Sequence, residues 1–429
     1  MSSSLLAPLK LRSYRRLVIG DILSGFGNWL DITALMVLLV YQWGLGPSST
    51  ATLMVTLGIP MVVLGPILSV WVDRLPLKGF VLTIVGLRVL LILGLIFVPN
   101  FYALLVIVFL RATLATLFFP ARQAMVRSLV PKEQLASAIS VGQLSLNLTM
   151  IAAPAIGGAL IPFIGTKTIF AIEAGLVFLA LLVLTGLPKM ERPKAPLPTG
   201  DGRTQSAPQK GKFLTELKAG FAHIAGSRQL TVAILLISIG MFLVFLYDGL
   251  LVIWAKGIGF GESGYGLMMS VIGLGSVGGA LLAGSVQSWR KSPLRLMALV
   301  GLLAGLLNIV IGLGGLQIFT LALPLWSILF LLFGLCGAVA TVPFGYLLQT
   351  ETPEHLIGRV SSVSASMQNA VTLLAPAIGA TLAEFYSVGP VFIGAGVLMF
   401  LLAMLTLLFL RRILGKKHHL PLQTDSAAQ

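Results

Sequence analysis

Long apolar segments joined by short polar connections run along the chain from about residue 17 to residue 411. Stretches such as FVLTIVGLRVLLILGLIFVP and VFIGAGVLMFLLAMLTLLFL have about 20 residues each, which an α-helix needs to cross a bilayer core of about 30 Å. We therefore predict twelve membrane-spanning helices. They lie at about 17–41, 50–72, 79–98, 101–121, 134–163, 167–188, 230–255, 264–287, 295–316, 321–347, 356–384 and 389–411.

Composition supports an all-α polytopic membrane protein. The hydrophobic fraction is 57% and the charged fraction is 10%, whereas soluble domains have about 45–50% and about 25%. A soluble chain of 429 residues could not bury so much apolar surface.

The net charge of +15 follows the predicted topology. If the amino terminus is cytoplasmic, all but four of the 29 lysines and arginines fall in cytoplasmic segments, and only Lys167 and Lys256 fall in external loops. This positive-inside asymmetry predicts a multi-pass protein of the inner or plasma membrane with both termini in the cytoplasm. The cations form no patch on a soluble face, so nucleic acid is not expected as a partner. The amino terminus lacks a cleavable signal pattern, so the first helix is expected to direct insertion.

A hydrophilic segment divides the chain. KMERPKAPLPTGDGRTQSAPQKGK is rich in Pro, Gly and charge, which is typical of a flexible linker. The following FLTELKAGFAHIAG has the apolar spacing of a helix on a membrane surface. Its basic residues could bind lipid headgroups or could simply follow the positive-inside pattern. We expect a first bundle at 1–188, a cytoplasmic linker with an amphipathic helix at 189–228, a second bundle at 229–411 and a cytoplasmic tail at 412–429.

The two bundles are predicted to be copies of one unit. IAAPAIGGAL at residues 151–160 returns as LLAPAIGATL at residues 373–382. Parallel repeats of six helices are one architecture of secondary transporters, with the binding site between the halves near the midplane. A shift of 222 residues relates Pro154 to Pro376, Pro131 to Pro353, Asn147 to Asn369 and Gly157 to Gly379.

Three stretches carry a resemblance to a known family. GPILSVWVDRLPLKG follows the second helix, FLRATLATLFFPARQAMVRSLVP belongs to the fourth, and IAAPAIGGAL belongs to the fifth. Together they resemble the major facilitator superfamily, in particular its drug/proton antiporter branch, which includes macrolide-efflux proteins. The chain departs from the family pattern at Ser69, Pro76, Leu77 and Ala153, where glycine, glycine, arginine and glycine are usual.

The resemblance implies a secondary active multidrug exporter and not an enzyme. Such a protein would exchange protons for amphipathic, macrolide-like cations by alternating access, as a monomer surrounded by membrane lipid. It would use the proton gradient and no cofactor. A siderophore or lysophospholipid transporter, or a transport-inactive sensor or scaffold, remains an alternative on the same fold.

The same motifs imply gating residues. Small residues allow helix backbones to approach closely in lipid, and proline bends a helix. The corner between the second and third helices is expected to latch in one state. Plain helix packing without a gating role is the alternative for the small residues. The expected gating residues are Asp73, Arg74, Lys78, Ala153, Pro154, Gly157, Gly158, Pro376 and Gly379.

Embedded charges are the candidates for proton coupling, because each costs roughly 2.5–3.5 kcal/mol on insertion scales. In the first helix Asp21, Ser24, Asn28 and Asp31 share one face. We expect this stripe to face the central cavity, although Asp21 could instead be a hydrated residue at its mouth. Asp31 would serve both proton coupling and, with Asn28, substrate binding.

Two further charges have competing interpretations. Glu173 could carry the proton or pair with Lys167. Arg111 stays protonated, so it could couple proton release to opening by moving with a carboxylate. Alternatively, Arg111 and Arg88 could form static salt bridges with Asp21 or Asp31.

The expected substrate site also includes the seventh helix. Asp248 is framed by Met241 and Phe245 on its helical face, and an acid among soft apolar side chains suits an amphipathic cation. A pair between Asp248 and Lys256 is the alternative. Asn147 and Gln368, on polar faces of the fifth and eleventh helices, could bind substrate or join helices.

Several patterns argue against other functions. GLGSVGG matches a dinucleotide fingerprint only formally, because no strand precedes it. The chain contains no GxxxxGK[ST] motif and no histidine cluster with ligand spacing, so neither ATP hydrolysis nor a metal site is expected. A siderophore exporter would favour basic cavity residues, whereas four embedded acids stand against two arginines.

Overall fold

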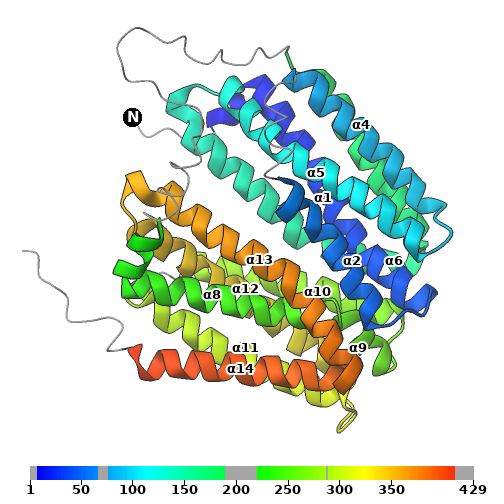
Figure 1. The fold of residues 1–429 in the computed structure, drawn as a ribbon, viewed down its shortest axis with the longest axis vertical. Helices are drawn as coiled ribbons and strands as arrows, with labels where there is room; N and C mark the ends of the chain where they lie inside the picture. The colour runs from blue at the N-terminus through cyan, green and yellow to red at the C-terminus, as the bar shows by residue number, and fades with distance from the viewer. Residues whose placement is uncertain (1–6, 66–75, 189–219, 287, 411–429) are drawn as a thin grey trace, which may run out of the picture.

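The computed structural model describes residues 7–65, 76–188, 220–286 and 288–410, which form helices and no strand (Figure 1). The first half begins with a short helix η1 (Ala7–Lys10), and π-helical turns extend its first two membrane helices. Its elements are α1 (Arg12–Val37), η2 (Leu38–Gln42), α2 (Pro47–Ile59), η3 (Pro60–Leu64), α4 (Leu77–Ile96), α5 (Phe101–Leu129), η4 (Lys132–Gln134) and α6 (Leu135–Thr185).

The second half follows the same order of helices. Its elements are α8 (Arg228–Asp248), α9 (Leu251–Gly257), α10 (Glu262–Ser285), η5 (Ser288–Lys291), α11 (Pro293–Gly315), α12 (Leu323–Thr350), α13 (Glu354–Tyr386) and α14 (Val388–Leu408).

Ten helices of the described chain are long and apolar enough to cross a membrane. The two other expected crossings are the first arm of α6 (residues 135–164) and α13, which are long but carry the repeated polar stripes. The fold is thus the predicted all-α polytopic one, in two related six-helix bundles.

Packing within each half confirms the repeat. In the first half α1 packs on α6, α4 on α5 and α6, and α2 on α5. In the second half α8 packs on α13 and α14, α11 on α12 and α14, and α10 on α12. Each pairing in one bundle therefore has its counterpart in the other, and Figure 1 shows the blue-to-cyan helices as one group and the green-to-red helices as another.

The predicted connection between the fifth and sixth crossings is a change of direction at Gly165 within one element, α6. Gly165 has φ 74° and ψ 165°, a conformation that glycine adopts without strain. The seventh crossing is instead interrupted between Asp248 and Leu251, where α8 ends and α9 begins.

The linker and the tail lie mostly outside the described residues. Residues 220–226 of the expected amphipathic helix are helical. Ile224 is buried in a cluster with Leu230 of α8 and Val360 and Val363 of α13. This described part of the segment therefore packs on the second bundle, and the proposed boundaries at 189–228 and 412–429 stay predictions.

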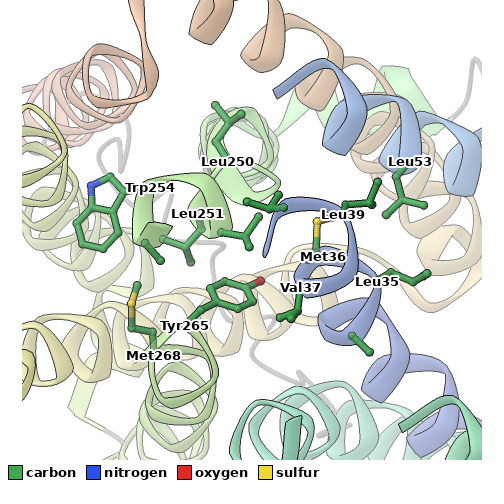
Figure 2. Packing of buried hydrophobic residues seen from close by; sticks show 14 of the residues in the cluster. Leu35, Met36, Val37, Leu39, Leu53, Leu250, Leu251, Trp254, Tyr265 and Met268 are labelled. Carbon is green, nitrogen blue, oxygen red and sulfur yellow. The ribbon is translucent and has the colours of Figure 1, made fainter. Parts of the chain in front are cut away.

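The bundles meet along α6 and α10 and along α2 and α13. We call the end with the α1–α2 and α9–α10 connections the outer end, because the charge asymmetry predicts it outside. A joint hydrophobic cluster of both halves fills this region, and Figure 2 shows some of its members. They include Leu35, Met36, Val37 and Leu39 of the first crossing, Leu53 of α2, Leu250, Leu251, Trp254, and Tyr265 and Met268 of α10.

Two hydrogen bonds tie the bundles together at the outer end. The Tyr41 hydroxyl donates to the Phe260 carbonyl oxygen at 2.8 Å, and Lys256 Nζ donates to the Val40 carbonyl oxygen at 2.6 Å. The Tyr41 ring also lies 6.4 Å from the Tyr265 ring, centroid to centroid, and 5.9 Å from Lys256 Nζ. The end of the first crossing is therefore bound to α9 and α10 of the other half.

Candidate functional site

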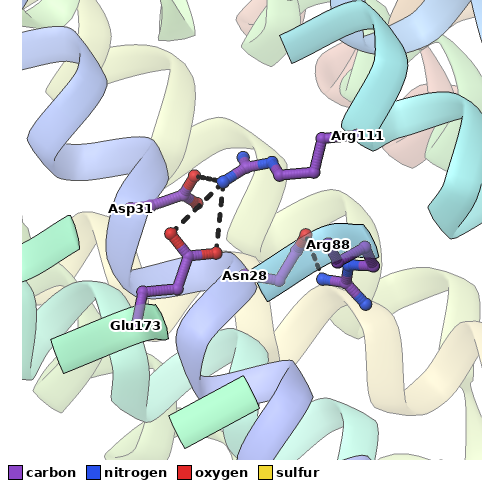
Figure 3. Close-up of polar contacts among 5 residues, drawn as sticks. All are labelled: Asn28, Asp31, Arg88, Arg111 and Glu173. Atoms are coloured by element: carbon purple, nitrogen blue, oxygen red, sulfur yellow. Dashed lines mark hydrogen bonds and ion pairs between the residues drawn. The ribbon is translucent and has the colours of Figure 1, made fainter. Parts of the chain in front are cut away.

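A cluster of embedded charges lies inside the first bundle (Figure 3). Arg111 of α5 donates from Nη1 to both carboxylate oxygens of Glu173 of α6, at 3.1 and 3.2 Å, and forms an ion pair with Asp31 of α1. Arg88 of α4 donates from Nη2 to Asn28 Oδ1 at 3.5 Å. Four helices thus bring together two arginines, two acids and one amide.

The side chains of this cluster are shielded from solvent. Asp31 and Glu173 are 0% exposed, Arg111 is 2% exposed and Arg88 is 4% exposed. Charges in an apolar interior are costly unless they are paired, and the four formal charges would sum to zero with both acids ionised. Gly27 makes room for the arrangement, because a Cβ atom there would lie 2.9 Å from Glu173 Cγ.

The polar stripe of the first helix was predicted to face the central cavity, and this prediction is wrong. Asp21, Ser24 and Asp31 are all buried, and Asn28 reaches Arg88 within the same bundle. Helical spacing identified the residues that share a face but could not reveal the neighbour that this face meets. The face meets α4, α5 and α6, which supply the arginines and the second acid.

The structure shows which ion pairs these charged residues form. Arg111 forms the salt bridge with Asp31 that was one alternative. Glu173 pairs with Arg111, so its suggested pairing with Lys167 is not the arrangement found. Whether the cluster moves protons stays a proposal.

A second buried ion pair joins Asp21 to Arg122, with Arg122 Nε 2.5 Å from Asp21 Oδ2. This pair was not predicted, because the fourth helix was expected to end near residue 121, which placed Arg122 in a cytoplasmic connection. The helix in fact continues to Leu129. Pro131, shortly after that end, was the signal for the longer helix.

Asp248 has a different environment. It is exposed at the end of α8 and has no cationic partner in the described parts of the chain. Lys256 binds the Val40 carbonyl oxygen instead, so the expected alternative of an Asp248–Lys256 pair is not found. Met241 and Phe245, on the same helix, are half-buried.

The position of Asp248 is close to the boundary between the bundles. A Cβ atom on the next residue, Gly249, would lie 3.8 Å from Thr50 and from Met54 of α2. The Asp248 carboxylate also interacts electrostatically with the hydroxyl of Tyr265, which lies at the outer-end contact. An exposed acid therefore directly precedes a residue that lies close to the first half.

The other expected substrate residues are not gathered at Asp248. The half-buried Gln368 donates from Nε2 to Ser364 Oγ of its own helix at 3.0 Å. The side chain of Asn147 lies outside the described part of the structure. Asn28 and Asp31 belong to the buried cluster of the first bundle.

The small residues of the repeated motif lie at close helix contacts. A Cβ atom on Gly158 would overlap the backbone of Gly266 across the boundary, and one on Gly157 would lie 3.2 Å from the Leu30 carbonyl oxygen. Gly379 meets the Leu246 carbonyl oxygen in the same way in the second bundle. Ala153 and Pro376 are buried and Pro154 is half-buried. The motif thus allows close packing, while its gating role stays a proposal.

In the loop motif, Asp73 and Arg74 lie outside the described residues. Lys78 Nζ donates to the Leu187 carbonyl oxygen at 2.5 Å, and Arg16 donates to the neighbouring Gly186 carbonyl oxygen. Both cations bind just beyond α6, where a positive charge is stabilised by the helix dipole.

We expect Lys78→Met to destabilise the protein by about 0.5–1.5 kcal/mol, because it removes a charged donor from the end of α6. Thermal unfolding of the purified protein in detergent measures this loss. Lys291→Met, which removes an exposed cation of η5, is the matched control and should leave the unfolding temperature unchanged. Equal unfolding temperatures for both variants would contradict the proposed cap.

Two related bundles of apolar helices are an architecture of secondary transporters, and ionisable groups buried among such helices are candidates for a functional site. The model of the Major Facilitator Superfamily matches residues 17–376, and the chain belongs to this superfamily.

Relatives of known sequence agree with this assignment. The chain is 27% identical over 426 residues to an uncharacterized MFS-type transporter, YfiS, of Bacillus subtilis, and 96% of each protein is covered. It is 29% identical over 272 residues to the enterobactin exporter EntS of Shigella flexneri. That match covers 62% of this chain and 58% of the exporter.

Solved structures share the fold. A mutant of the nucleoside transporter NupG aligns with a TM-score of 0.69 and 14% identity over 93% of this chain and 100% of the other. A bacterial homolog of the human lysosomal transporter Spinster, inward-facing and unoccupied, aligns with a TM-score of 0.59 and 12% identity over 94% and 95%.

Proposed function

We propose that this transporter exports amphipathic cations in exchange for protons by alternating access. The observation that carries the proposal is the environment of Asp248. Among the four embedded acids, Asp21, Asp31 and Glu173 are buried on arginines, whereas Asp248 is exposed and has no cationic partner among the described residues.

The surroundings of Asp248 favour a cation with an apolar body. A carboxylate close to the boundary between the bundles can attract a positive charge strongly, because the nearby interior has a lower dielectric constant than water. Met241 and Phe245 offer soft and aromatic surface on the same helix, which adapts to varied apolar shapes. Arg88 and Arg111 are both buried in the charge cluster, which leaves neither available to an anionic substrate.

The charge cluster supports proton coupling. Asp31 and Glu173 share the single guanidinium of Arg111, and two carboxylates that compete for one cation repel each other. A proton on either acid relieves this repulsion. The arginine stays charged, so the carboxyl pair would be the carrier and Arg111 would respond to its charge.

Siderophore export is the second candidate, because the chain is similar to enterobactin exporters over 62% of its length. An anionic aromatic substrate needs a cation beside apolar surface. Arg122 meets this need in part, since it lines a pocket between α5 and the first arm of α6 together with Phe119, Gln123, Ile139 and Leu146. Its Nε is already engaged by Asp21, so this site supports an anion less well than Asp248 supports a cation.

Transport into inverted membrane vesicles tests the proposal. An imposed pH gradient should drive uptake of cationic dyes and a macrolide by the unmodified protein. Asp248→Asn should reduce this uptake at least about tenfold, the equivalent of 1.4 kcal/mol. Glu384→Gln, which neutralises an exposed acid of α13, is the matched control and should transport normally.

The same vesicles separate the alternatives. Unchanged dye uptake by Asp248→Asn would remove the assigned cation site. Uptake of a catecholate siderophore without uptake of any cation would favour the second candidate. Absence of flux for every cation, siderophore and lysophospholipid in the panel would favour a sensor or scaffold.

A further inference from the structure

Arg88 is a buried guanidinium without a carboxylate of its own. It is 4% exposed, and no acid of the described chain lies within 4.0 Å of its nitrogen atoms. Its Nη2 donates to Asn28 Oδ1 at 3.5 Å, and its Nε has no hydrogen-bond partner. A guanidinium has five N–H donors, so Arg88 is poorly satisfied for a charge inside a membrane bundle.

The carboxylates of the cluster are engaged by the other arginine. The cluster contains two arginines and two carboxylates, yet both carboxylates contact Arg111. Asp31 and Glu173 also interact electrostatically with Arg88. Figure 3 shows Arg111 in contact with both acids, whereas the contact drawn for Arg88 is the one with Asn28.

This uneven sharing is the arrangement expected when the cluster carries one proton. One carboxylate and one carboxylic acid can share a guanidinium without repulsion, whereas two carboxylates are best placed on one arginine each. The proton-loaded cluster has a formal charge of +1, and the proton-free cluster is neutral. A change in proton number therefore changes how many arginines the acids need.

We propose that Arg88 is the second partner of Glu173 and that Glu173 exchanges Arg111 for Arg88 when the proton leaves. The carboxyl O–H bond breaks, the proton passes to water, and the new carboxylate pairs with Arg88 while Asp31 keeps Arg111. Glu173 is the acid that moves because its side chain is one methylene longer than that of Asp31. The proposal rests on the proton-coupled function proposed above.

Arg88 is in this view a positioning residue that connects α4 to the proton cycle. The polar and charged groups that act on Arg88 come from three elements: Asp31 and Asn28 belong to α1, Arg111 to α5 and Glu173 to α6. Exchange of Glu173 would replace the weak amide contact of Arg88 by an ion pair between α4 and α6, which already pack together. Release of the proton would thereby add an ion pair between these two helices.

Transport measurements test the exchange. Arg88→Gln should lower pH-gradient-driven accumulation at least about tenfold, while substrate exchange at equal pH on both sides continues, because that exchange needs no proton release. Arg88→Lys keeps the charge and should retain part of the driven transport. Arg127→Gln, which removes an exposed arginine of α5, should behave like the unmodified protein.

Infrared titration of the full-length protein gives a readout that does not depend on transport. The unmodified protein should show a carboxylic acid band that disappears as the pH rises and is absent in Glu173→Gln. In Arg88→Gln the band should persist to higher pH, because the second cation for the carboxylate is missing. Arg88→Lys should restore the normal titration.

The outcomes separate this proposal from the function on which it rests. An unchanged titration and unchanged driven transport in Arg88→Gln would overturn the role of Arg88. Equal loss of driven transport and of exchange, in a variant that elutes and melts normally, would also overturn it. A shifted band in a protein that moves none of the tested substrates would support the exchange while the proposed function fails.

Discussion

Arg111→Met is expected to unfold at much lower temperature than the unmodified protein, with a loss of about 3–5 kcal/mol. The reason is that removal of one partner of a buried ion pair leaves an uncompensated charge, and here the single guanidinium serves two carboxylates, Asp31 and Glu173. Both acids are 0% exposed, so water cannot replace the lost contacts. Thermal unfolding in detergent and the yield of monodisperse protein measure the effect.

A compensated variant separates charge from packing. Arg111→Met combined with Glu173→Gln leaves Asp31 and Arg88 as the charges of the cluster, which sum to zero, and should recover part of the lost stability. It should nevertheless fail to couple transport to a pH gradient, because the proposed proton carrier is missing. An Arg111→Met protein that melts with the unmodified one would show that the two carboxylates do not depend on this arginine.

Gly158→Val should abolish transport by separating the two bundles at the outer end. Even a Cβ atom at this position would overlap the backbone of Gly266, and backbone atoms cannot move aside as a flexible side chain can. Overpacking of a close contact costs typically about 1–3 kcal/mol. Here it destabilises the conformation in which the outer end is closed. Vesicle transport measures activity, and labelling of the cysteine in a Leu39→Cys background, at a position that is 0% exposed in the joint cluster, measures closure.

Another glycine of the same helix provides the control. No atom of a neighbouring element lies within 4 Å of the place that a Cβ atom would take at Gly175, so Gly175→Val changes helix propensity without a steric clash. It should transport normally and keep the introduced cysteine protected. Equal transport by both valine variants would contradict the importance of the Gly158–Gly266 contact.

The fold was predictable because few types of secondary structure can span a membrane. Apolar segments long enough to span the bilayer must be helices when no closed barrel is indicated, and the 222-residue repeat divides them into two bundles. The change of direction at Gly165 falls in the predicted connection between the fifth and sixth crossings. The end of α8 at Asp248 was not predicted, because hydropathy varies too smoothly to mark a local change of backbone direction.

The sequence identified most residues of the charge cluster, but it did not show which of them contact one another. The free-energy cost of placing a charged side chain inside the membrane identified Asp31, Glu173 and Arg111 as candidates for a functional site. Their mutual contacts depend on how α1, α5 and α6 are rotated against each other, and one helix's periodicity contains no such information. The Asp21–Arg122 pair was missed for a simpler reason, namely an underestimated length of the fourth helix.

The distribution of the acids has an evolutionary consequence under the proposed mechanism. The energy-converting groups are confined to one bundle and neutralise one another there, whereas the exposed acid for recognition belongs to the other. Substitutions around Asp248 can therefore retune ligand preference while the ion-driven machinery stays intact. Members of one lineage could diversify their cargo by changes in a single half.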